Sequence, residues 1–287
     1  MAEIKDNTID LIYCDILYGT GRKFKDYQDL KPIRSEIESH YIPRIKEMHR
    51  ILKPTGSIYL QMDWRINHWI RCIMDDIFGY EQFKNEIIWS YRSQGLGKTY
   101  IKQHDNILFY TKTNEFTFNN EFERIRFEKK FMDVKQDKFG YYRDVRIRDV
   151  WDDIKFLNSL QNESKNYEYD TKKPIKLIER IIKTSSNEGD LIADFYAGAF
   201  TTAHACKNLN RSFIGCDINP NCFEKTKRSC GLLRSTARTK QGIRGSQSNG
   251  TTKRYYGSYK TNTNRYSNTK LLPKQFNSIR KDIRAYP

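Results

Sequence analysis

Short apolar runs alternate with amphipathic stretches over the first 218 residues of the chain. The continuous runs predict buried strands at residues 9–14, 57–62, 86–91, 107–111, 190–195 and 212–218. Apolar residues at helical spacing predict helices at residues 33–52, 65–78, 175–185 and 201–209. Strands that alternate with helices are typical of an α/β fold, in which a mostly parallel, twisted sheet carries helices on both faces.

Aspartates close three of these predicted strands, at Asp15, Asp194 and Asp217. Open α/β sheets bind their ligands at the carboxyl ends of parallel strands. A small-residue turn at 197–199 follows Asp194, and Asp217 ends the next strand. Such a turn lets a ligand approach backbone N–H groups, and such an acid suits the hydroxyls of a ribose. The segment predicts a nucleoside-containing cofactor, with an ordinary strand–turn–helix as the alternative; the absence of GxGxxG argues against a dinucleotide.

The chain carries 51 Lys and Arg against 35 Asp and Glu, a formal net charge of +16. Residues 231–287 hold 13 of these cations and one acid, in a tail rich in Ser, Thr, Asn and Gly. This composition predicts a mostly disordered tail, in which Tyr255, Tyr256, Tyr259 and Tyr266 stand among the cations. Cations that neutralise phosphates and rings that stack on bases suit nucleic acid. A solvated tail without a specific partner is the alternative.

Several classes of protein are excluded by what the sequence lacks. No run of about 18 apolar residues that would span a membrane occurs, and residues 1–10 do not have the pattern of a secretory signal. The six cysteines show no CxxC spacing, and the five histidines are not spaced as metal ligands. We therefore expect a reduced, cytoplasmic chain without a metal site.

Several motifs follow one another in a fixed order over residues 5–228. They are DILYGTG (15–21), HRILKPTGSIYLQMDW (49–64), NEIIWSYRSQGLGKTYIKQHDNILFYTK (85–112), DVWDDI (149–154), YDTKKPIKLIERIIKTSSNEGDLIADFYAGAFTT (169–202) and FIGCDINP (213–220). With these motifs the chain resembles the DNA amino-methyltransferases, which transfer a methyl group from S-adenosyl-L-methionine to adenine N6 or cytosine N4. The catalytic motif precedes the cofactor motif, as in the permuted beta group. The resemblance implies a Rossmann-like methyltransferase fold, S-adenosyl-L-methionine as cofactor and double-stranded DNA as partner.

The resemblance assigns catalysis to Asp15-Ile16-Leu17-Tyr18, which stand where the family has Asp-Pro-Pro-Tyr or Asp-Pro-Pro-Phe. It implies that the Asp15 carboxylate and the Ile16 carbonyl accept the two N–H groups of the target amine. Tyr18 would stack on a base flipped out of the duplex. Aspartate rather than serine at the first position favours adenine N6 over cytosine N4. Both prolines of the tetrapeptide are replaced, so their fixed φ is lost.

The resemblance also implies a set of cofactor-binding residues in the second half of the chain: Thr171, Lys173, Asp194, Tyr196, Gly198, Thr201 and Asp217. Phe200 departs from the family, which has a second glycine at that position, and we expect its ring to crowd the cofactor or to shift the turn. His104-Asp105, within HDNILFYTK, is interpreted as structural.

The resemblance divides residues 1–230 into three parts: a catalytic half (1–114), a candidate target-recognition insertion (115–150) and a cofactor-binding half (151–230). The basic low-complexity tail (231–287), set apart by its composition, is the fourth part of the chain. The insertion mixes aromatic residues with Arg and Lys and lacks the apolar period of an independent core, so a charged surface excursion is the alternative. Arg22, Lys23 and Lys25 follow the catalytic strand, and we expect them to bind phosphates around the flipped base.

Two classes of function remain open from the sequence. One is an adenine-N6 DNA methyltransferase of bacterial or phage type, acting alone or with a cognate restriction endonuclease in a restriction–modification pair, as a monomer or a homodimer. The other is a degenerate, non-catalytic DNA-binding relative. Cytosine-N4, RNA and protein-glutamine methyltransferases are lesser alternatives within the first class.

Overall fold

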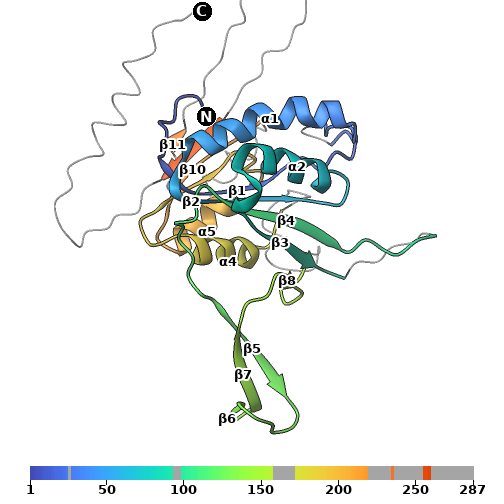
Figure 1. The fold of residues 1–287 in the computed structure, drawn as a ribbon, viewed down its shortest axis with the longest axis vertical. Coiled ribbons are helices and arrows are strands. Elements are labelled where there is room, and N and C mark those ends of the chain that lie inside the picture. The colour runs from blue at the N-terminus through green and yellow to red at the C-terminus, as the bar shows by residue number, and fades with distance from the viewer. Residues whose placement is uncertain (25–26, 93–97, 158–171, 219–233, 236–254, 260–287) are drawn as a thin grey trace, which may run out of the picture.

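A computed structural model describes residues 1–24, 27–92, 98–157, 172–218, 234–235 and 255–259 (Figure 1). The helices of this part are α1 (Arg34–Ile51), α2 (Asn67–Phe78), the 3₁₀ helix η1 (Tyr80–Gln82), α4 (Ile175–Ser185) and α5 (Thr201–Asn208). The strands are β1 (Ile9–Asp15), β2 (Leu52–Met62), β3 (Phe83–Ser90), β4 (His104–Thr111), β5 (Phe122–Phe127), β6 (Lys135–Asp137), β7 (Gly140–Arg146), β8 (Val150–Trp151), β9 (Leu191–Asp194), β10 (Ser212–Asp217), β11 (Arg234–Ser235) and β12 (Tyr255–Tyr259). None of these helices combines the length and the apolar character needed to cross a membrane.

The main sheet has the strand order β11-β12-β10-β9-β1-β2-β4-β3-β8. Its centre is parallel, since β10 pairs with β9, β9 with β1 and β1 with β2 in that sense. β4 runs antiparallel to both β2 and β3, and β12 runs antiparallel to β10. The predicted α/β class is confirmed. Each predicted strand and helix corresponds to an observed one, with β2, β3 and β4 beginning a few residues earlier than predicted.

Helices cover both faces of the main sheet, α1 and α2 on one face and α4 and α5 on the other (Figure 1). β1 contributes to both layers because neighbouring side chains of a strand point to opposite faces. Leu11 and Tyr13 pack in the core under α4 and α5, whereas Ile12 and Cys14 pack in the core under α1 and α2. All four side chains are buried, so the strand reads as a continuous apolar run instead of an alternating one.

β1 and β9 are neighbours whose chains continue in opposite directions across the sheet. β1 leads through α1 to β2 on one side, and β9 leads through α5 to β10 on the other. Such a switch leaves a crevice beyond the carboxyl ends of the two strands, because the connections diverge there. Asp15 and Asp194 are the last residues of these strands. The topology therefore brings two of the predicted aspartates to one crevice.

β5, β7 and β6 form a separate three-stranded sheet, the small sheet, which projects away from the main sheet (Figure 1). None of residues 112–150 is buried, so no apolar core holds this sheet together. Ion pairs supplement its backbone hydrogen bonds: Arg124 lies 2.7 Å from Asp144, and Arg126 lies 2.9 Å from Asp137. The missing apolar period in the sequence of the insertion agrees with this arrangement.

Part of the basic tail extends the main sheet. β12 pairs antiparallel with β10, from Phe213 opposite Tyr259 to Asp217 opposite Tyr255, and β11 pairs with β12. The sequence predicts a mostly disordered tail and does not indicate these two short strands. The physical reason is that β10 would otherwise present a row of unpaired backbone groups, which an extended segment of any composition satisfies. Tyr266 lies outside the described residues.

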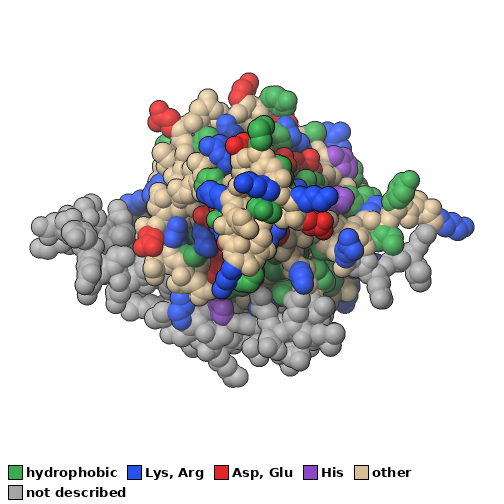
Figure 2. All heavy atoms as spheres, turned by 90° about the horizontal axis from the view of Figure 1, so that it is seen from below, with side chains coloured by type: hydrophobic (Ala, Val, Ile, Leu, Met, Phe, Trp, Pro, Cys, Tyr) green, Lys and Arg blue, Asp and Glu red, His purple; other side chains and the backbone are tan. Residues whose placement is uncertain are grey.

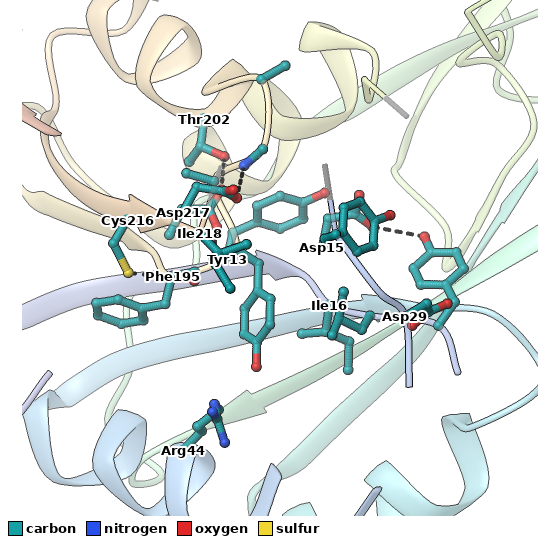
Figure 3. A pocket seen from close by; sticks show the side chains of 18 of the residues that line it. Tyr13, Asp15, Ile16, Asp29, Arg44, Phe195, Thr202, Cys216, Asp217 and Ile218 are labelled. Carbon is teal, nitrogen blue, oxygen red and sulfur yellow. Dashed lines mark hydrogen bonds between the residues drawn. The ribbon is translucent and has the colours of Figure 1, made fainter. Parts of the chain in front are cut away.

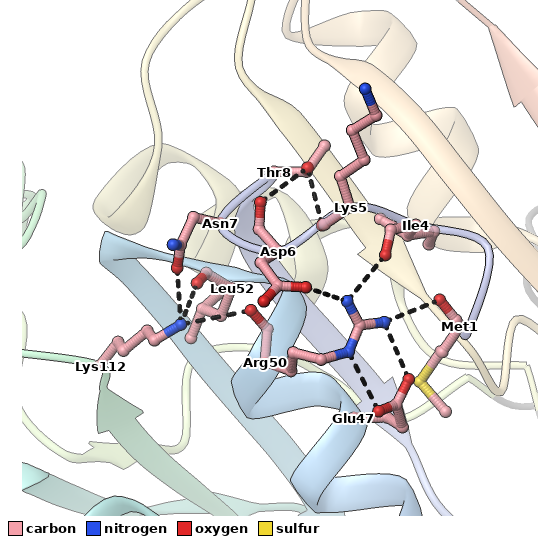
Figure 4. A network of polar contacts seen from close by, with 10 residues as sticks. All are labelled: Met1, Ile4, Lys5, Asp6, Asn7, Thr8, Glu47, Arg50, Leu52 and Lys112. Atoms are coloured by element: carbon pink, nitrogen blue, oxygen red, sulfur yellow. Dashed lines mark hydrogen bonds and ion pairs between the residues drawn. The ribbon is translucent and has the colours of Figure 1, made fainter. Parts of the chain in front are cut away.

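Arg50, near the end of α1, holds the N-terminal segment against the fold (Figure 4). Its guanidinium binds the carboxylates of Asp6 and Glu47 and donates to the carbonyl oxygens of Met1 and Ile4. Four acceptors from two parts of the chain thus share one planar cation, whose several donors suit such a set. The side chain of Arg50 is 29% exposed, so solvent screens these contacts only in part.

We expect Arg50→Met to lower the free energy of unfolding by about 1–2 kcal/mol after allowance for this exposure, because charged hydrogen bonds are lost while the aliphatic stem stays. Arg34→Met is the matched control, since Arg34 lies on the same helix and forms one exposed ion pair with Glu38 at 2.7 Å. That variant is expected to show no measurable change. Urea unfolding compares the two, and equal losses would contradict a special role for Arg50.

Candidate active site

A cavity of about 940 Å³ opens at the carboxyl ends of β1, β9 and β10 (Figure 3). Figure 3 shows Thr202, Cys216 and Asp217 on one side of it and Asp15 and Ile16 on the other. The lining includes nine of the predicted site residues: Asp15, Ile16, Tyr18, Lys173, Asp194, Tyr196, Gly198, Thr201 and Asp217. The fold therefore brings the first and the last motifs of the sequence to one place.

Asp15 and Lys173 form an ion pair in this cavity, with Nζ of the lysine 2.8 Å from Oδ2 of the aspartate. The Tyr18 hydroxyl lies 2.9 Å from Oδ1 of Asp15, and the Lys173 ammonium lies 5.1 Å from the centre of the Tyr18 ring. Burial raises the pKa of Asp15, and the Lys173 charge opposes that shift. Burial disfavours the charge of Lys173 in turn, but the neighbouring carboxylates outweigh it and raise the pKa of the lysine.

Asp105, near the start of β4, is a further carboxylate at this site and is 4% exposed. It accepts hydrogen bonds from the Tyr18 hydroxyl at 2.7 Å, the Gln61 amide at 2.8 Å and the Tyr91 hydroxyl at 2.9 Å. Lys173 Nζ lies 3.8 Å from its Oδ2. The structural role inferred from the sequence missed these contacts, because Asp105 stands 87 residues after Tyr18. The available signal was an acid at the head of a buried strand.

Hydrogen bonds fix the two residues that replace the family's prolines. The Ile16 N–H donates to the Gln61 carbonyl at 3.0 Å, a bond for which proline has no hydrogen. The Tyr41 hydroxyl donates to the Leu17 carbonyl at 2.9 Å. Contacts with β2 and α1 therefore restrain the stretch that two proline rings would otherwise stiffen.

Asp194 and Asp217 hold the turn between β9 and α5. Asp194 is 2% exposed and accepts the Tyr196 N–H at 3.0 Å and the Thr202 hydroxyl at 2.6 Å. Burial raises the pKa of Asp194 to about 7, although these two hydrogen bonds lower it. Asp217, the last residue of the neighbouring strand β10, accepts the Gly198 N–H at 2.8 Å. The turn is thus anchored to the carboxyl ends of both β9 and β10.

Phe200 stands where the resemblance expects a second glycine, and its backbone adopts a conformation typical of glycine. Its φ of 56° and ψ of 31° lie in the left-handed region, directly before α5. The ring is fully buried in the core under α4 and α5, with its centroid 6.1 Å from that of Phe213. It takes no part in the cavity lining. The expectation that Phe200 crowds the cavity is therefore wrong, because the left-handed φ turns the ring into the core.

Two further lining residues, Phe195 and Ile218, were not singled out from the sequence. Each directly follows a predicted aspartate, which is the signal that identifies them.

The Tyr196 hydroxyl lies 3.1 Å from Nε2 of His40 on α1. Burial, aided by a neighbouring arginine, lowers the pKa of His40 to about 4, so its ring is neutral at neutral pH. The aromatic and apolar side of the cavity thus carries no additional charge from this histidine.

Among the predicted phosphate-binding residues, Arg22 and Lys23 are exposed and lie outside the cavity lining. They belong to a narrow hairpin after β1, in which Lys23 forms the bridging pair. Buried Asp29 holds the base of this hairpin by accepting three backbone N–H groups, those of Gly19 at 3.2 Å and of Thr20 and Leu30 at 2.8 Å each. Lys25 and Thr171 lie outside the described residues.

We expect Phe200→Ala to lower the free energy of unfolding by about 3–4 kcal/mol, because a buried ring is lost while the left-handed backbone remains strained. Phe200→Gly loses the same ring but relieves the strain, so it is expected to be about 1 kcal/mol more stable than Phe200→Ala. Urea unfolding of the two variants measures this order. A glycine variant less stable than the alanine variant would show that the left-handed φ is not maintained.

Comparison with known proteins places the chain among enzymes. Residues 9–228 match the N6/N4 methyltransferase family model, whose description is DNA methylase. The chain is 35% identical over 231 residues to the type II methyltransferase M.HpaI of Haemophilus parainfluenzae, covering 79% of this chain and 69% of that protein. It is 29% identical over 231 residues to the DNA adenine methyltransferase YhdJ of Escherichia coli, covering 76% of each.

The fold is also similar to that of a solved structure. The structure of M1.HpyAVI in complex with SAM (S-adenosylmethionine) superimposes with a TM-score of 0.51 at 18% identity, covering 78% of this chain and 90% of the other. At this identity the likeness concerns the fold alone, whereas the family model covers most of the sequence and includes Asp15, Asp194 and Asp217. The chain belongs to the N6/N4 family of DNA methylases.

Proposed function

We propose that this chain transfers a methyl group from S-adenosylmethionine to the N6 amino group of adenine in double-stranded DNA. The observation that carries the proposal is the Asp15 carboxylate, which lines the cavity at the end of β1 next to the Tyr18 side chain. An amino-substituted base flipped out of the duplex requires a hydrogen-bond acceptor for its amine and an aromatic surface for its ring. Asp15 and Tyr18 supply these two features together.

The other side of the cavity fits the cofactor. Asp217 ends β10 and is held by the Gly198 N–H, as an acceptor for ribose hydroxyls would be. Phe195 and Ile218 add apolar surface suited to an adenine ring. A volume of about 940 Å³ lies at the upper end of the range for ligand pockets, which supports a site for both the cofactor and a base.

When bound, S-adenosylmethionine supplies an electrophilic sulfonium methyl group. The task of the chain's own residues is to make the lone pair of the amine nitrogen available, since it is delocalised into the base ring. Asp15 and the Ile16 carbonyl accept the two N–H groups and draw the nitrogen toward tetrahedral geometry. The Tyr18 ring holds the plane of the base. Positioning and electrostatic stabilisation then account for most of the rate enhancement.

Two observations support adenine over cytosine as the substrate. Aspartate, not serine, heads the tetrapeptide, and the relative YhdJ is described as an adenine methyltransferase. Because M.HpaI is a type II methyltransferase, we also propose a role in restriction–modification, with a cognate endonuclease as partner. A cytosine-N4 product and a chain that binds DNA without methylating it are the alternatives that the experiment below separates.

We expect the wild type to form 6-methyladenine in unmethylated genomic DNA supplied with labelled S-adenosylmethionine, and Asp15→Ala to lower kcat by at least about 100-fold. The reason is that the variant has no side-chain acceptor for the amine. Nucleoside mass spectrometry identifies the product. Asp76→Ala, which removes an exposed carboxylate on α2, is the matched control and should retain full activity.

Calorimetry with S-adenosylmethionine completes this experiment. A product of 4-methylcytosine would contradict the adenine assignment while keeping the enzyme class. Cofactor binding and methyl transfer that are both absent would contradict the proposed function and favour a non-catalytic DNA-binding protein. An Asp15→Ala variant as active as the wild type would contradict the role of the tetrapeptide.

We further propose two DNA contacts outside the cavity. Arg22 and Lys23 bind phosphates, because their side chains are exposed on the hairpin next to the catalytic strand. The small sheet reads the target sequence. Figure 2, which views the molecule from the side on which this sheet projects, shows Lys and Arg side chains across the middle of the face. At the β6–β7 turn, Lys138 lies 4.9 Å from the ring of Phe139, which is 69% exposed.

The double variant Arg22→Ala/Lys23→Ala is expected to weaken binding to all DNA sequences alike and to reduce the slope of log K against log salt by about 2. Lys138→Ala/Phe139→Ala is expected instead to lower the ratio of target to non-target affinity, because base contacts specify and phosphate contacts position. Anisotropy titrations at several salt concentrations measure both quantities. An unchanged slope in the first variant, or an unchanged ratio in the second, would count against the respective contact.

A further inference from the structure

The Tyr18 hydroxyl lies between two carboxylates. Its oxygen is 2.9 Å from Oδ1 of Asp15 and 2.7 Å from Oδ2 of Asp105. A tyrosine hydroxyl has one hydrogen, and an ionised carboxylate has none to offer. Only one of the two aspartates therefore receives this hydrogen at a time, and rotation about the C–O bond of Tyr18 transfers the hydrogen bond from one to the other.

Asp105 is built to remain a fixed acceptor. The Gln61 amide nitrogen donates to it, and the orientation of that amide is set by the Tyr13 hydroxyl, which donates to Oε1 of Gln61 at 2.8 Å. The Tyr91 hydroxyl donates to the other oxygen of Asp105. Gln61 and Tyr13 are buried, so water does not compete for these bonds. The Asp105 carboxylate is thereby held in one plane, with Oδ2 toward Tyr18.

We propose that Asp105 is a positioning residue of the methyl-transfer site, in a step that rests on the proposed function. When the target amine reaches Asp15, Asp105 accepts the hydrogen of the Tyr18 hydroxyl, so that Oδ1 of Asp15 is left for an N–H of the amine. The same hydrogen bond fixes the ring of Tyr18 against which the base lies. No proton leaves Tyr18, because only the direction of its O–H bond changes.

The first test is a double-mutant cycle on kcat with Asp105→Asn and Tyr18→Phe. Asparagine keeps the shape but replaces one acceptor oxygen by a donor NH₂, in a place where three donors converge. We expect Asp105→Asn to lower kcat by about 10- to 100-fold, with the KM values for S-adenosylmethionine and DNA within about twofold of the wild type. The double variant is expected to be no slower than Tyr18→Phe alone within about twofold, because Asp105 acts through the hydroxyl.

The second readout is the pH dependence of kcat. In Asp105→Asn the Tyr18 hydroxyl donates to Asp15, and a hydrogen bond to a carboxylate favours its ionised form. The loss of the Asp105 charge, which raises the pKa of Asp15 in the wild type, acts in the same direction, while the Lys173 ammonium stays beside Asp15 in both proteins. The acid limb of the profile is therefore expected to move to lower pH. Tyr91→Phe removes one donor of Asp105 without changing its charge, and it is expected to give a smaller loss of kcat that also disappears in the Tyr18→Phe background. This variant serves if Asp105→Asn does not fold.

Asp75→Asn is the matched control, because Asp75 on α2 also accepts a tyrosine hydroxyl, that of Tyr110 at 2.5 Å, outside the cavity lining. Asp75→Asn should leave kcat unchanged, although its loss of thermal stability is expected to be comparable to that of Asp105→Asn. The role of Asp105 would be overturned if the kcat losses of Asp105→Asn and Tyr18→Phe multiplied in the double variant and the acid limb of Asp105→Asn did not move. Methylation by the wild type would still uphold the proposed function in that case. A wild type that forms no methylated base would overturn both.

Discussion

The ion pair between Lys173 and Asp15 joins two residues that are 158 positions apart in the sequence, and both residues line the cavity. The side chains are only 12% and 23% exposed. Removing one partner would leave the other as an uncompensated charge in a poorly hydrated place, which in other proteins costs about 3–5 kcal/mol. Burial alone would favour a protonated Asp15, and the ammonium opposes this. The same contact therefore holds two distant parts of the chain together at the cavity and favours the ionised form of the Asp15 carboxylate.

Two departures from the family pattern are compensated by contacts from distant parts of the chain. Phe200 occupies a glycine position at a cost of about 1–2 kcal/mol for its left-handed backbone, and the burial of its ring against Phe213 contributes at least as much. Ile16 and Leu17 lack the stiffness of proline, and bonds to Gln61 and Tyr41 restrain them instead. At both departures, contacts with other elements thus restrain the backbone or bury the side chain.

Local signals explain what could be predicted from the sequence. The strands that end at Asp15, Asp194 and Asp217 are continuous apolar runs, and the spacing of turn and helix after them is short, so their common edge follows from the class of fold. The position of Asp105 does not follow, because it depends on the antiparallel pairing of β4 with β2. The strand β12 depends in the same way on an open edge of β10, which no local composition reveals.

The aspartates of the site differ in the donors that hold them, and this difference separates their tasks. Asp194 is buried with a backbone N–H and the Thr202 hydroxyl, donors that are themselves fixed by the turn. Asp105 is held by an amide from β2 and by a hydroxyl from the residue that directly follows β3. Asp15 instead has a lysine on a flexible stem and a hydroxyl with a second acceptor within reach. The target amine of the proposed reaction can replace the Tyr18 hydroxyl at Asp15 without leaving that hydroxyl unsatisfied, because Asp105 accepts its hydrogen. Among these three carboxylates, Asp15 is therefore the one that can exchange its partners during a reaction.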